Sequence, residues 1–156
     1  MKNILIIKTG AIGDVVRTTS LLNVLGGNIY WLTADECKPV FPETDLTILS
    51  PNDDLSVLKG TRFDLVLSLE EDPDCATLAT DIDKKQLIGV YASDDGISYT
   101  DDSAHWFDMS RVSRLGIQKA NELKAANRIT RLLSGALPRR ASPHSVETSS
   151  SRLPGP

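Results

Sequence analysis

Short apolar runs alternate along the chain with segments of helical pattern. The first run, residues 4–7, is β-branched or Leu throughout, which is typical of a strand covered on both faces. Strands are predicted at 4–7, 29–33, 46–49, 63–69 and 86–90. Helices are predicted at 14–25, 72–80, 103–115 and 118–133, with a short one ending near 60 and a polar hairpin-like excursion at 93–101. This alternation indicates the α/β class, here a Rossmann-like parallel sheet with helices on both faces.

Composition and charge divide the chain near Arg128. With 156 residues and 40% hydrophobic content the chain can bury one core, so a single domain is predicted over residues 1–127. These residues carry a net charge of −8, which argues against nucleic acid as the main partner. Residues 128–156 carry +4 and are rich in Arg, Ser and Pro, which favours a disordered, solvated tail over a segment that binds anionic lipid or RNA. The abrupt change also suggests that the coding frame is interrupted near Arg128, so that the tail is not native to the fold.

The two cysteines and the hydropathy of the chain indicate the cellular compartment of the protein. Cys37 and Cys75 form no C-x-x-C pair, which favours two reduced thiols of a cytoplasmic protein over a disulfide. The apolar run near the start is too short for a signal peptide, and no apolar span reaches membrane length. A soluble or peripherally membrane-associated protein is therefore predicted. His105 has no partners at metal-ligand spacing, so it is assigned to packing, and neither a metal nor a cofactor is expected.

The most informative segment is the loop between the first strand and the first helix. Gly10 and Gly13 are expected to let the backbone turn and approach a ligand closely. Asp14 stands where the helix starts, and a helix N-terminus favours a carboxylate or a phosphate nearby. The glycine spacing fits neither the G-x-G-x-x-G dinucleotide fingerprint nor the G-x-x-x-x-G-K-[ST] phosphate loop. An anion or sugar site is predicted at this junction.

A set of residues in this loop and the following helix matches a known signature: Lys8, Gly13, Asp14, Arg17, Thr18, Thr19, Leu21 and Leu22. On these residues the chain resembles the amino-terminal part of the ADP-heptose:lipopolysaccharide heptosyltransferases, glycosyltransferase family 9, which open with a strand, a Lys-x-x-x-x-Gly-Asp loop and a helix rich in Thr and Leu. The likeness continues through residues 31–33, 63–69 and 105–110 and ends near Asn127.

The resemblance implies a fold and an activity. Family 9 enzymes consist of two Rossmann-like halves that face a cleft, the GT-B architecture, so the chain would correspond to the acceptor-side half and would lack the half that binds the donor. The reaction implied is the inverting, metal-independent transfer of a heptose from ADP-heptose to a lipopolysaccharide core acceptor, at the cytoplasmic face of the bacterial inner membrane. The chain alone is therefore expected to have little or no transferase activity.

Roles for the loop residues follow from the same resemblance. Asp14 matches the proposed general base, although the residue pattern alone also suits a helix N-cap. Lys8 either contacts an acidic group or phosphate of the acceptor or is a solvent-exposed cation. The residues expected to shape the acceptor pocket through their backbone are Thr9, Gly10, Ala11, Ile12 and Gly13.

Two further side chains are candidates. Arg17 lies one helical turn after Asp14 and would pair with it, contact an anionic acceptor or simply face solvent. The acidic run at 70–74 follows the fourth strand, where open parallel sheets place ligands, but it also suits the start of a helix. Within that run Glu70 is the residue expected to face the cleft.

Other function classes remain open at this point. The main alternative is a non-catalytic α/β domain that binds a nucleotide or phosphate with the same loop. A phospho-receiver domain is disfavoured, because Lys8 and Thr9 follow the first strand and Ser50 the third, where acidic residues would be needed. An unstable remnant with an exposed interdomain surface is the last possibility.

Overall fold

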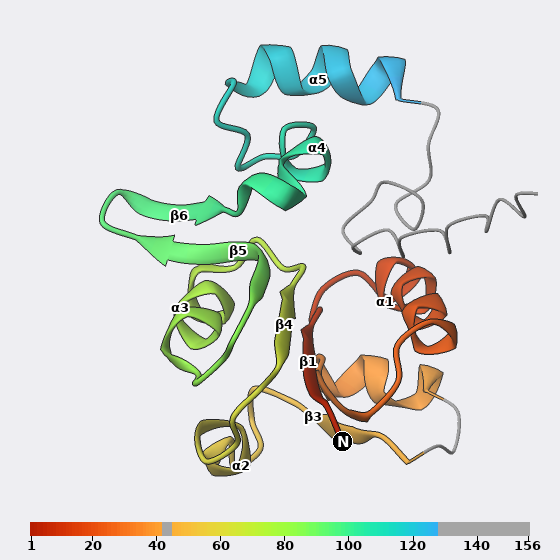
Figure 1. The fold of residues 1–156 in the computed structure, drawn as a ribbon. Helices are drawn as coiled ribbons and strands as arrows, with labels where there is room; N and C mark the ends of the chain where they lie inside the picture. The colour runs from red at the N-terminus through yellow and green to blue at the C-terminus, as the bar shows by residue number, and fades with distance from the viewer. Residues whose placement is uncertain (42–44, 128–156) are drawn as a thin grey trace, which may run out of the picture.

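A computed structural model describes residues 1–41 and 45–127 (Figure 1). The predictions made for the tail, residues 128–156, namely its disorder and the interrupted frame, lie outside the described residues. The helix predicted at 118–133 is shorter than expected, because it ends at Ala126 and Asn127 has an extended backbone; residues 128–133 lie outside the described residues.

The described residues form one six-stranded sheet in the order β3-β2-β1-β4-β5-β6. The five parallel strands are β1 (Asn3–Ile7), β2 (Asn28–Leu32), β3 (Thr47–Leu49), β4 (Leu65–Ser68) and β5 (Leu87–Ser93). The last strand, β6 (Gly96–Tyr99), runs antiparallel to β5 and forms the hairpin predicted at 93–101. The strand order reverses at β1, which pairs with β2 on one side and with β4 on the other. The predicted Rossmann-like α/β fold is confirmed.

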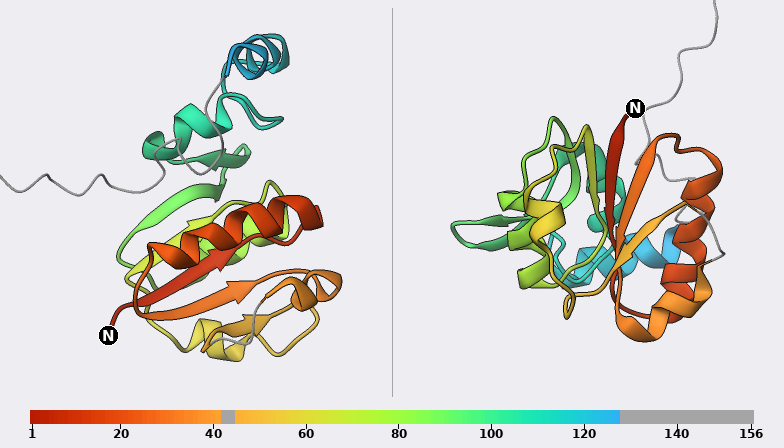
Figure 2. Two further views of the ribbon diagram at one scale, coloured as in Figure 1. Left: turned by 90° about the vertical axis from the view of Figure 1, so that its right-hand side faces the viewer. Right: turned by 90° about the horizontal axis from the view of Figure 1, so that it is seen from below.

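Helices cover both faces of the sheet (Figures 1 and 2). On one face lie α1 (Ile12–Thr18) and the 3₁₀ segments η1 (Thr19–Asn23) and η2 (Asp35–Val40). On the other face lie α2 (Ser56–Lys59) and α3 (Pro73–Asp81). This arrangement explains why β1 is a continuous apolar run: side chains alternate across a strand, and both faces of this strand are covered.

The core divides along this alternation. Leu5 and Ile7 pack toward α2 and α3, in a cluster with Phe63, Cys75 and Ala79. On the opposite face the buried members are Ile4, Ile6, Ile29, Trp31, Leu67 and Ile88. The assignment of the Trp31 indole to the core is confirmed, since the side chain is fully buried and its ring lies 4.8 Å from that of Phe41.

The first helix differs from its prediction. A helix was expected over 14–25, whereas the α-helix begins at Ile12, ends at Thr18 and continues as the tighter η1. Hydroxyl groups compete for the carbonyls at this point: Thr18 Oγ1 donates to the Asp14 carbonyl at 2.7 Å, and Thr19 Oγ1 donates to Val16 at 2.7 Å. Such back-bonding by Ser and Thr weakens a regular helix, which accounts for the early end.

The helix predicted at 103–115 is also wrong in length. It is reduced to η3 (Asp101–Ser103) and α4 (Ala104–Phe107), after which the chain turns until α5 (Ile117–Ala126). The Tyr99 hydroxyl holds this turn on the hairpin, because it donates to Asp108 and accepts from the Arg114 backbone N–H at 2.8 Å. The packing role expected for residues 105–107 is confirmed for Phe107, which is buried in a cluster with Val90 and Tyr99. His105 is exposed, so its assignment to packing is wrong.

Candidate functional site

The predicted site residues lie at the carboxyl ends of β1 and β4. These strands are neighbours, with Ile7 opposite Ser68, although more than sixty positions of sequence separate them. In open parallel sheets the ligand crevice forms at the carboxyl ends of the strands, at the point where the strand order reverses. The loop after β1 and the start of the segment after β4 therefore meet where a ligand would be expected.

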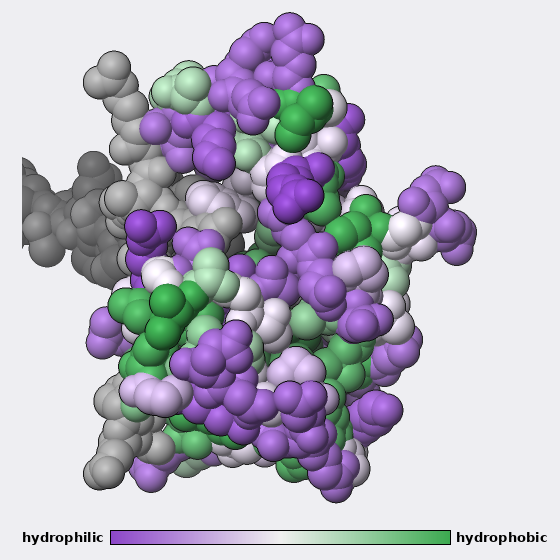
Figure 3. Space-filling model, turned by 180° about the vertical axis from the view of Figure 1, so that it is seen from behind, coloured by the Kyte–Doolittle hydropathy of each residue, from purple (hydrophilic) through white to green (hydrophobic). Residues whose placement is uncertain are grey.

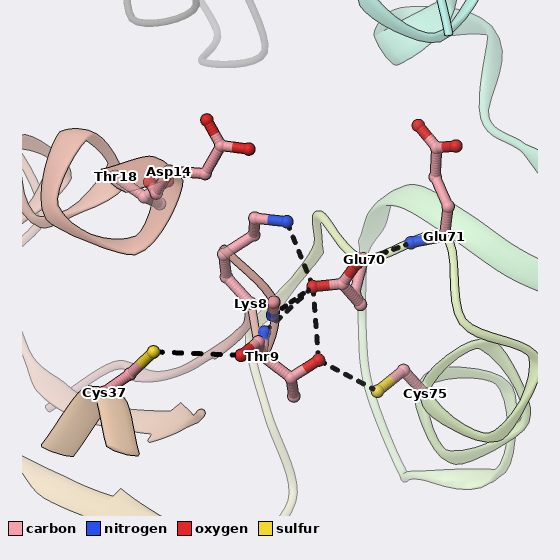
Figure 4. A network of polar contacts seen from close by, with 9 residues as sticks. Lys8, Thr9, Asp14, Thr18, Cys37, Glu70, Glu71 and Cys75 are labelled. Carbon is pink, nitrogen blue, oxygen red and sulfur yellow. Dashed lines mark hydrogen bonds and ion pairs between the residues drawn. The ribbon is translucent and has the colours of Figure 1, made fainter. Parts of the chain in front are cut away.

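One carboxylate joins the two loops (Figure 4). Oxygen Oε2 of Glu70 accepts from four donors: Gly10 N at 2.7 Å, Lys8 Nζ at 3.0 Å, Thr9 N at 3.0 Å and Thr9 Oγ1 at 3.1 Å. The second oxygen, Oε1, accepts from the backbone N–H of Glu71 at 3.2 Å. Glu70 thus holds the β1 loop to the end of β4.

Burial and charge explain the state of Glu70. Burial raises the pKa of this carboxyl group, but the hydrogen bonds from Gly10 and Lys8, together with the charge of Lys8, outweigh burial and place the pKa below its ordinary value of 4.5. The Lys8 side chain is 6% exposed and that of Glu70 16% exposed. The alternative that Lys8 is a solvent-exposed cation is therefore wrong, because this ammonium group is buried against Glu70.

The backbone of the loop departs from the expectation for its glycines. The residue with a positive φ is Ala11, at φ 50° and ψ 97°, whereas neither Gly10 nor Gly13 has one. Gly13 lies inside α1, and a Cβ added to it would meet nothing within 4 Å. At Gly10 the absence of a side chain is important, because a Cβ there would lie 3.3 Å from Glu70 Oε2, closer than most Cβ atoms lie to a neighbouring atom. Gly10 serves a close approach, and Ala11 makes the turn.

Asp14 lies in the first turn of α1, two residues after its start at Ile12. The N-cap position belongs to Ala11, so the N-cap interpretation of Asp14 is wrong. The Asp14 side chain is 29% exposed, and Arg17 Nη1 lies 3.4 Å from Oδ1. In Figure 4 no contact is drawn between the Asp14 carboxylate and the Lys8–Glu70 pair. Two of the three roles weighed for Arg17 are observed together: it pairs with Asp14, and its side chain, 71% exposed, faces solvent.

The site residues thus fall into two groups. Lys8, Thr9, Gly10 and Glu70 form one hydrogen-bonded network, and Asp14 with Arg17 forms a second, more exposed pair. The acidic run after β4 divides as well: Asp72 caps α3, because its Oδ1 accepts from the backbone of Asp74 and Cys75 at 3.0 Å each. The helix-start interpretation is confirmed for Asp72, whereas Glu70 turns back toward the β1 loop.

Both cysteines border the network, a placement that their spacing in the sequence does not indicate. Cys75 Sγ lies 3.9 Å from Thr9 Oγ1, and Cys37 Sγ donates to the Thr9 carbonyl at 4.0 Å, from η2 on the other side of the sheet (Figure 4). Both thiols are free and buried. Burial raises the pKa of Cys75 to about 12, so this thiol stays protonated at neutral pH. The cysteines act here as small packing residues around Thr9.

A groove of about 670 Å³ lies beside the network, on the face that carries α2 and α3. Its lining includes the apolar residues Leu32, Leu55 and Leu78 together with Asp72 and Cys75, and Cys75 contacts Thr9 of the β1 loop. Asp14 is not among the lining residues, so this groove and the Asp14–Arg17 pair are separate features.

The surface of α1 is partly apolar. Ile12 and Val16 stand one turn apart on this helix and are 53% and 50% exposed, and Val24, just after η1, is 67% exposed. Figure 3 shows apolar residues gathered on the side of the molecule where α1 and η1 lie. The charged Asp14–Arg17 pair therefore belongs to a helix that also presents apolar side chains to solvent.

Over residues 1–41 and 45–127, no group of three or more His, Cys, Asp or Glu side chains is placed to hold a metal ion. Within the same ranges no helix is long and apolar enough to cross a membrane. Comparison with protein-family models, with curated proteins and with solved structures finds no match for this chain.

Proposed function

We propose that residues 1–127 form the acceptor-side domain of an inverting glycosyltransferase of the heptosyltransferase type. The observation that carries the proposal is the position of Asp14. Its carboxylate is partly exposed, lies in the first turn of α1 and follows the loop after β1, the strand at which the strand order reverses. Two things support it, namely the agreement of the loop and helix with the family 9 signature and the Rossmann-like strand order.

In this proposal Asp14 is the general base. Its carboxylate accepts the proton of an acceptor hydroxyl while that oxygen forms a bond to the anomeric carbon of the donor. The bond between the anomeric carbon and the diphosphate oxygen breaks at the same time, and its electron pair leaves with ADP. Arg17, with its nitrogen 3.4 Å from Oδ1, orients the carboxylate toward the acceptor.

The network around Glu70 has a supporting role in the same proposal. It fixes Thr9 and Gly10, the residues that lead into Ala11 and the start of α1. A general base must be held in place to act, because positioning supplies much of the catalytic effect of such a step. Lys8 then contributes through Glu70, by holding the loop, while the acceptor contacts come from the loop backbone.

The remaining components follow from the resemblance. The acceptor proposed is a lipopolysaccharide core saccharide, and the donor is ADP-heptose bound by a domain outside residues 1–127. The site of action proposed is the cytoplasmic face of the bacterial inner membrane, with peripheral association. Because the donor is bound elsewhere, the chain alone should release ADP from ADP-heptose no faster than its Asp14→Ala variant does.

A paired titration tests this function. The isotope-labelled full chain is titrated with an inner-core heptose saccharide that carries no phosphate and, separately, with ADP, and the backbone amide signals are followed by NMR. The proposal expects saturable shifts with the saccharide at residues 9–17, and none there with ADP. Saccharide that shifts no signal in this range contradicts the proposal, and tight binding of ADP to the same loop favours a nucleotide-binding domain instead.

A further inference from the structure

The donors of the β1 loop converge on a single oxygen of the protein itself. We propose that Glu70 is a specificity-determining residue, a built-in anion that occupies the phosphate position of this loop, so that the site takes neutral sugar hydroxyls and rejects phosphate groups. The substrate class that this implies rests on the proposed function, whereas the occupation of the loop by Glu70 does not.

Four donors of two kinds, backbone N–H groups and side chains, surround one oxygen of Glu70. Two successive backbone N–H groups, of Thr9 and Gly10, point at Oε2 of Glu70 from 3.0 and 2.7 Å. Successive N–H groups directed at one point form the concave arrangement that binds anions in phosphate-binding loops. The ammonium group of Lys8 and the hydroxyl of Thr9 complete the set at 3.0 and 3.1 Å. A carboxylate oxygen has about two lone pairs, so this set of four donors is more than one such oxygen requires.

Glu70 also supplies the negative charge that Lys8 requires. Lys8 is buried, with only 6% of its side chain exposed, and a buried cation needs a partner. In a phosphate-binding loop that partner is the ligand, whereas in this chain it is Glu70. The hydrogen bonds and the Lys8 charge keep the pKa of Glu70 below its ordinary value, so at neutral pH the residue is ionised and fills the site with negative charge.

Glu70 also fills the space beside Gly10. The missing side chain of Gly10 lets its backbone approach closely, as a glycine does beside a bound phosphate, but the atom in contact is Glu70 Oε2, 3.3 Å from where a Cβ would stand. A phosphate placed on the same donors would overlap this oxygen and would be repelled by its charge. Nucleotide phosphates are thereby excluded from the loop, which leaves the outer part, toward Asp14 and Arg17, for uncharged hydroxyl groups.

The test is a gain of anion binding on removal of the carboxylate. Inorganic phosphate is titrated into the full chain and its Glu70→Ala variant, at constant ionic strength in chloride, and the amide signals of Thr9 and Gly10 are followed by NMR. The variant should bind phosphate at least about tenfold more tightly than the unaltered chain, as expected for a buried cation and two amides left without an acceptor. The double variant Lys8→Met/Glu70→Ala should lose most of this gain.

Glu71→Ala is the matched control. It removes a carboxylate one position along the chain, and Figure 4 shows the Glu71 carboxylate directed away from the Lys8–Glu70 pair. Its backbone N–H, which donates to Glu70 at 3.2 Å, is unchanged by the substitution. This variant should bind phosphate as weakly as the unaltered chain does.

Two outcomes would overturn the proposal. One is a folded Glu70→Ala chain whose phosphate affinity equals that of the unaltered chain. The other is a saturable shift of the Thr9 and Gly10 amide signals when phosphate is added to the unaltered chain, which would show that Glu70 does not occupy the phosphate position. This measurement needs no variant, so it can be made even if Glu70→Ala fails to fold. Neither result bears on saccharide binding near Asp14, and a failed saccharide titration would not change the phosphate result. The proposal for Glu70 and the proposed function can therefore be contradicted independently of each other.

Discussion

The ammonium nitrogen of Lys8 lies 3.0 Å from Oε2 of Glu70, and this contact joins the carboxyl ends of β1 and β4 across 62 residues of sequence. Both side chains are largely withdrawn from water. A pair of this kind stabilises the fold only while both members are present, because removal of one leaves the other buried without its partner.

The two members of the pair should differ in their effect on stability. Glu70→Ala leaves a buried cation and three backbone N–H groups without this acceptor. It should lower the free energy of unfolding by about 2–3 kcal/mol, less than for a fully buried pair because Glu70 is partly exposed. Lys8→Met keeps the apolar stem and leaves Glu70 three loop donors, so the cost should be about 1 kcal/mol. Urea unfolding measures both, and equal costs would contradict this ranking.

The pH dependence of stability should also report on Glu70. Its pKa in the folded chain is below the ordinary value of 4.5, so folding favours the ionised form. The stabilisation is therefore fully present above the unfolded-state pKa and is lost as the pH falls through the lower, folded-state pKa. Urea unfolding from about pH 7 to about pH 3 should show a smaller loss of stability in Glu70→Gln than in the unaltered chain. Glu71→Gln is the control, and parallel curves for all three proteins would refute the assignment.

Ala11 offers a test of the turn. Its φ of 50° is in the region that favours glycine, and its side chain is exposed, so substitutions there act through the backbone. Ala11→Gly should change the free energy of unfolding by less than about 1 kcal/mol, since relief of strain offsets the added freedom of the unfolded chain. Ala11→Val should destabilise by more than about 1 kcal/mol, because a β-branched residue is strained at this φ. Thermal unfolding measures the difference, and a Val variant as stable as the Gly variant would place the turn elsewhere.

The thiols should be slow to react in the folded chain. Cys75 is buried and burial raises its pKa to about 12, so almost none of it is thiolate at about pH 8. Iodoacetamide labelling followed by peptide mass mapping should show little modification of Cys75 in buffer and complete modification in urea. Rapid labelling of Cys75 in the native chain would mean that this side of the network opens to solvent.

Much of the fold could be predicted from the sequence, because the strands are short apolar runs separated by turn residues. The predicted strands at 4–7 and 29–33 agree closely with β1 and β2, and the hairpin after β5 was expected from its polar turn. The length of the helix predicted at 103–115 is wrong because the end of this helix depends on a tertiary contact, the hydrogen bond between the Tyr99 hydroxyl and the Arg114 backbone N–H. The local sequence pattern does not indicate such a contact.

The residues of the site could be predicted from the sequence, but the contacts between them could not. Lys8 and Glu70 were each placed at a strand end, but their contact requires β1 and β4 to be adjacent, which depends on strand order and not on local sequence. The turn at Ala11 was assigned to the neighbouring glycines, because a positive φ is rare for alanine. The approach of both cysteines to Thr9 has no signal in their spacing at all.

The role of Asp14 is tested most directly by the affinity of the full chain for an inner-core heptose saccharide that carries no phosphate, measured for the unaltered chain, Asp14→Asn and Asp94→Asn. Asp94 is an exposed residue of the β5–β6 turn, so its variant makes the same chemical change away from the site. If the Asp14 carboxylate accepts a hydrogen bond from an acceptor hydroxyl, Asp14→Asn should bind the saccharide at least about fivefold more weakly, because a charged hydrogen bond is lost. The affinity of Asp94→Asn should be unchanged. Equal affinity in all three proteins would contradict the account.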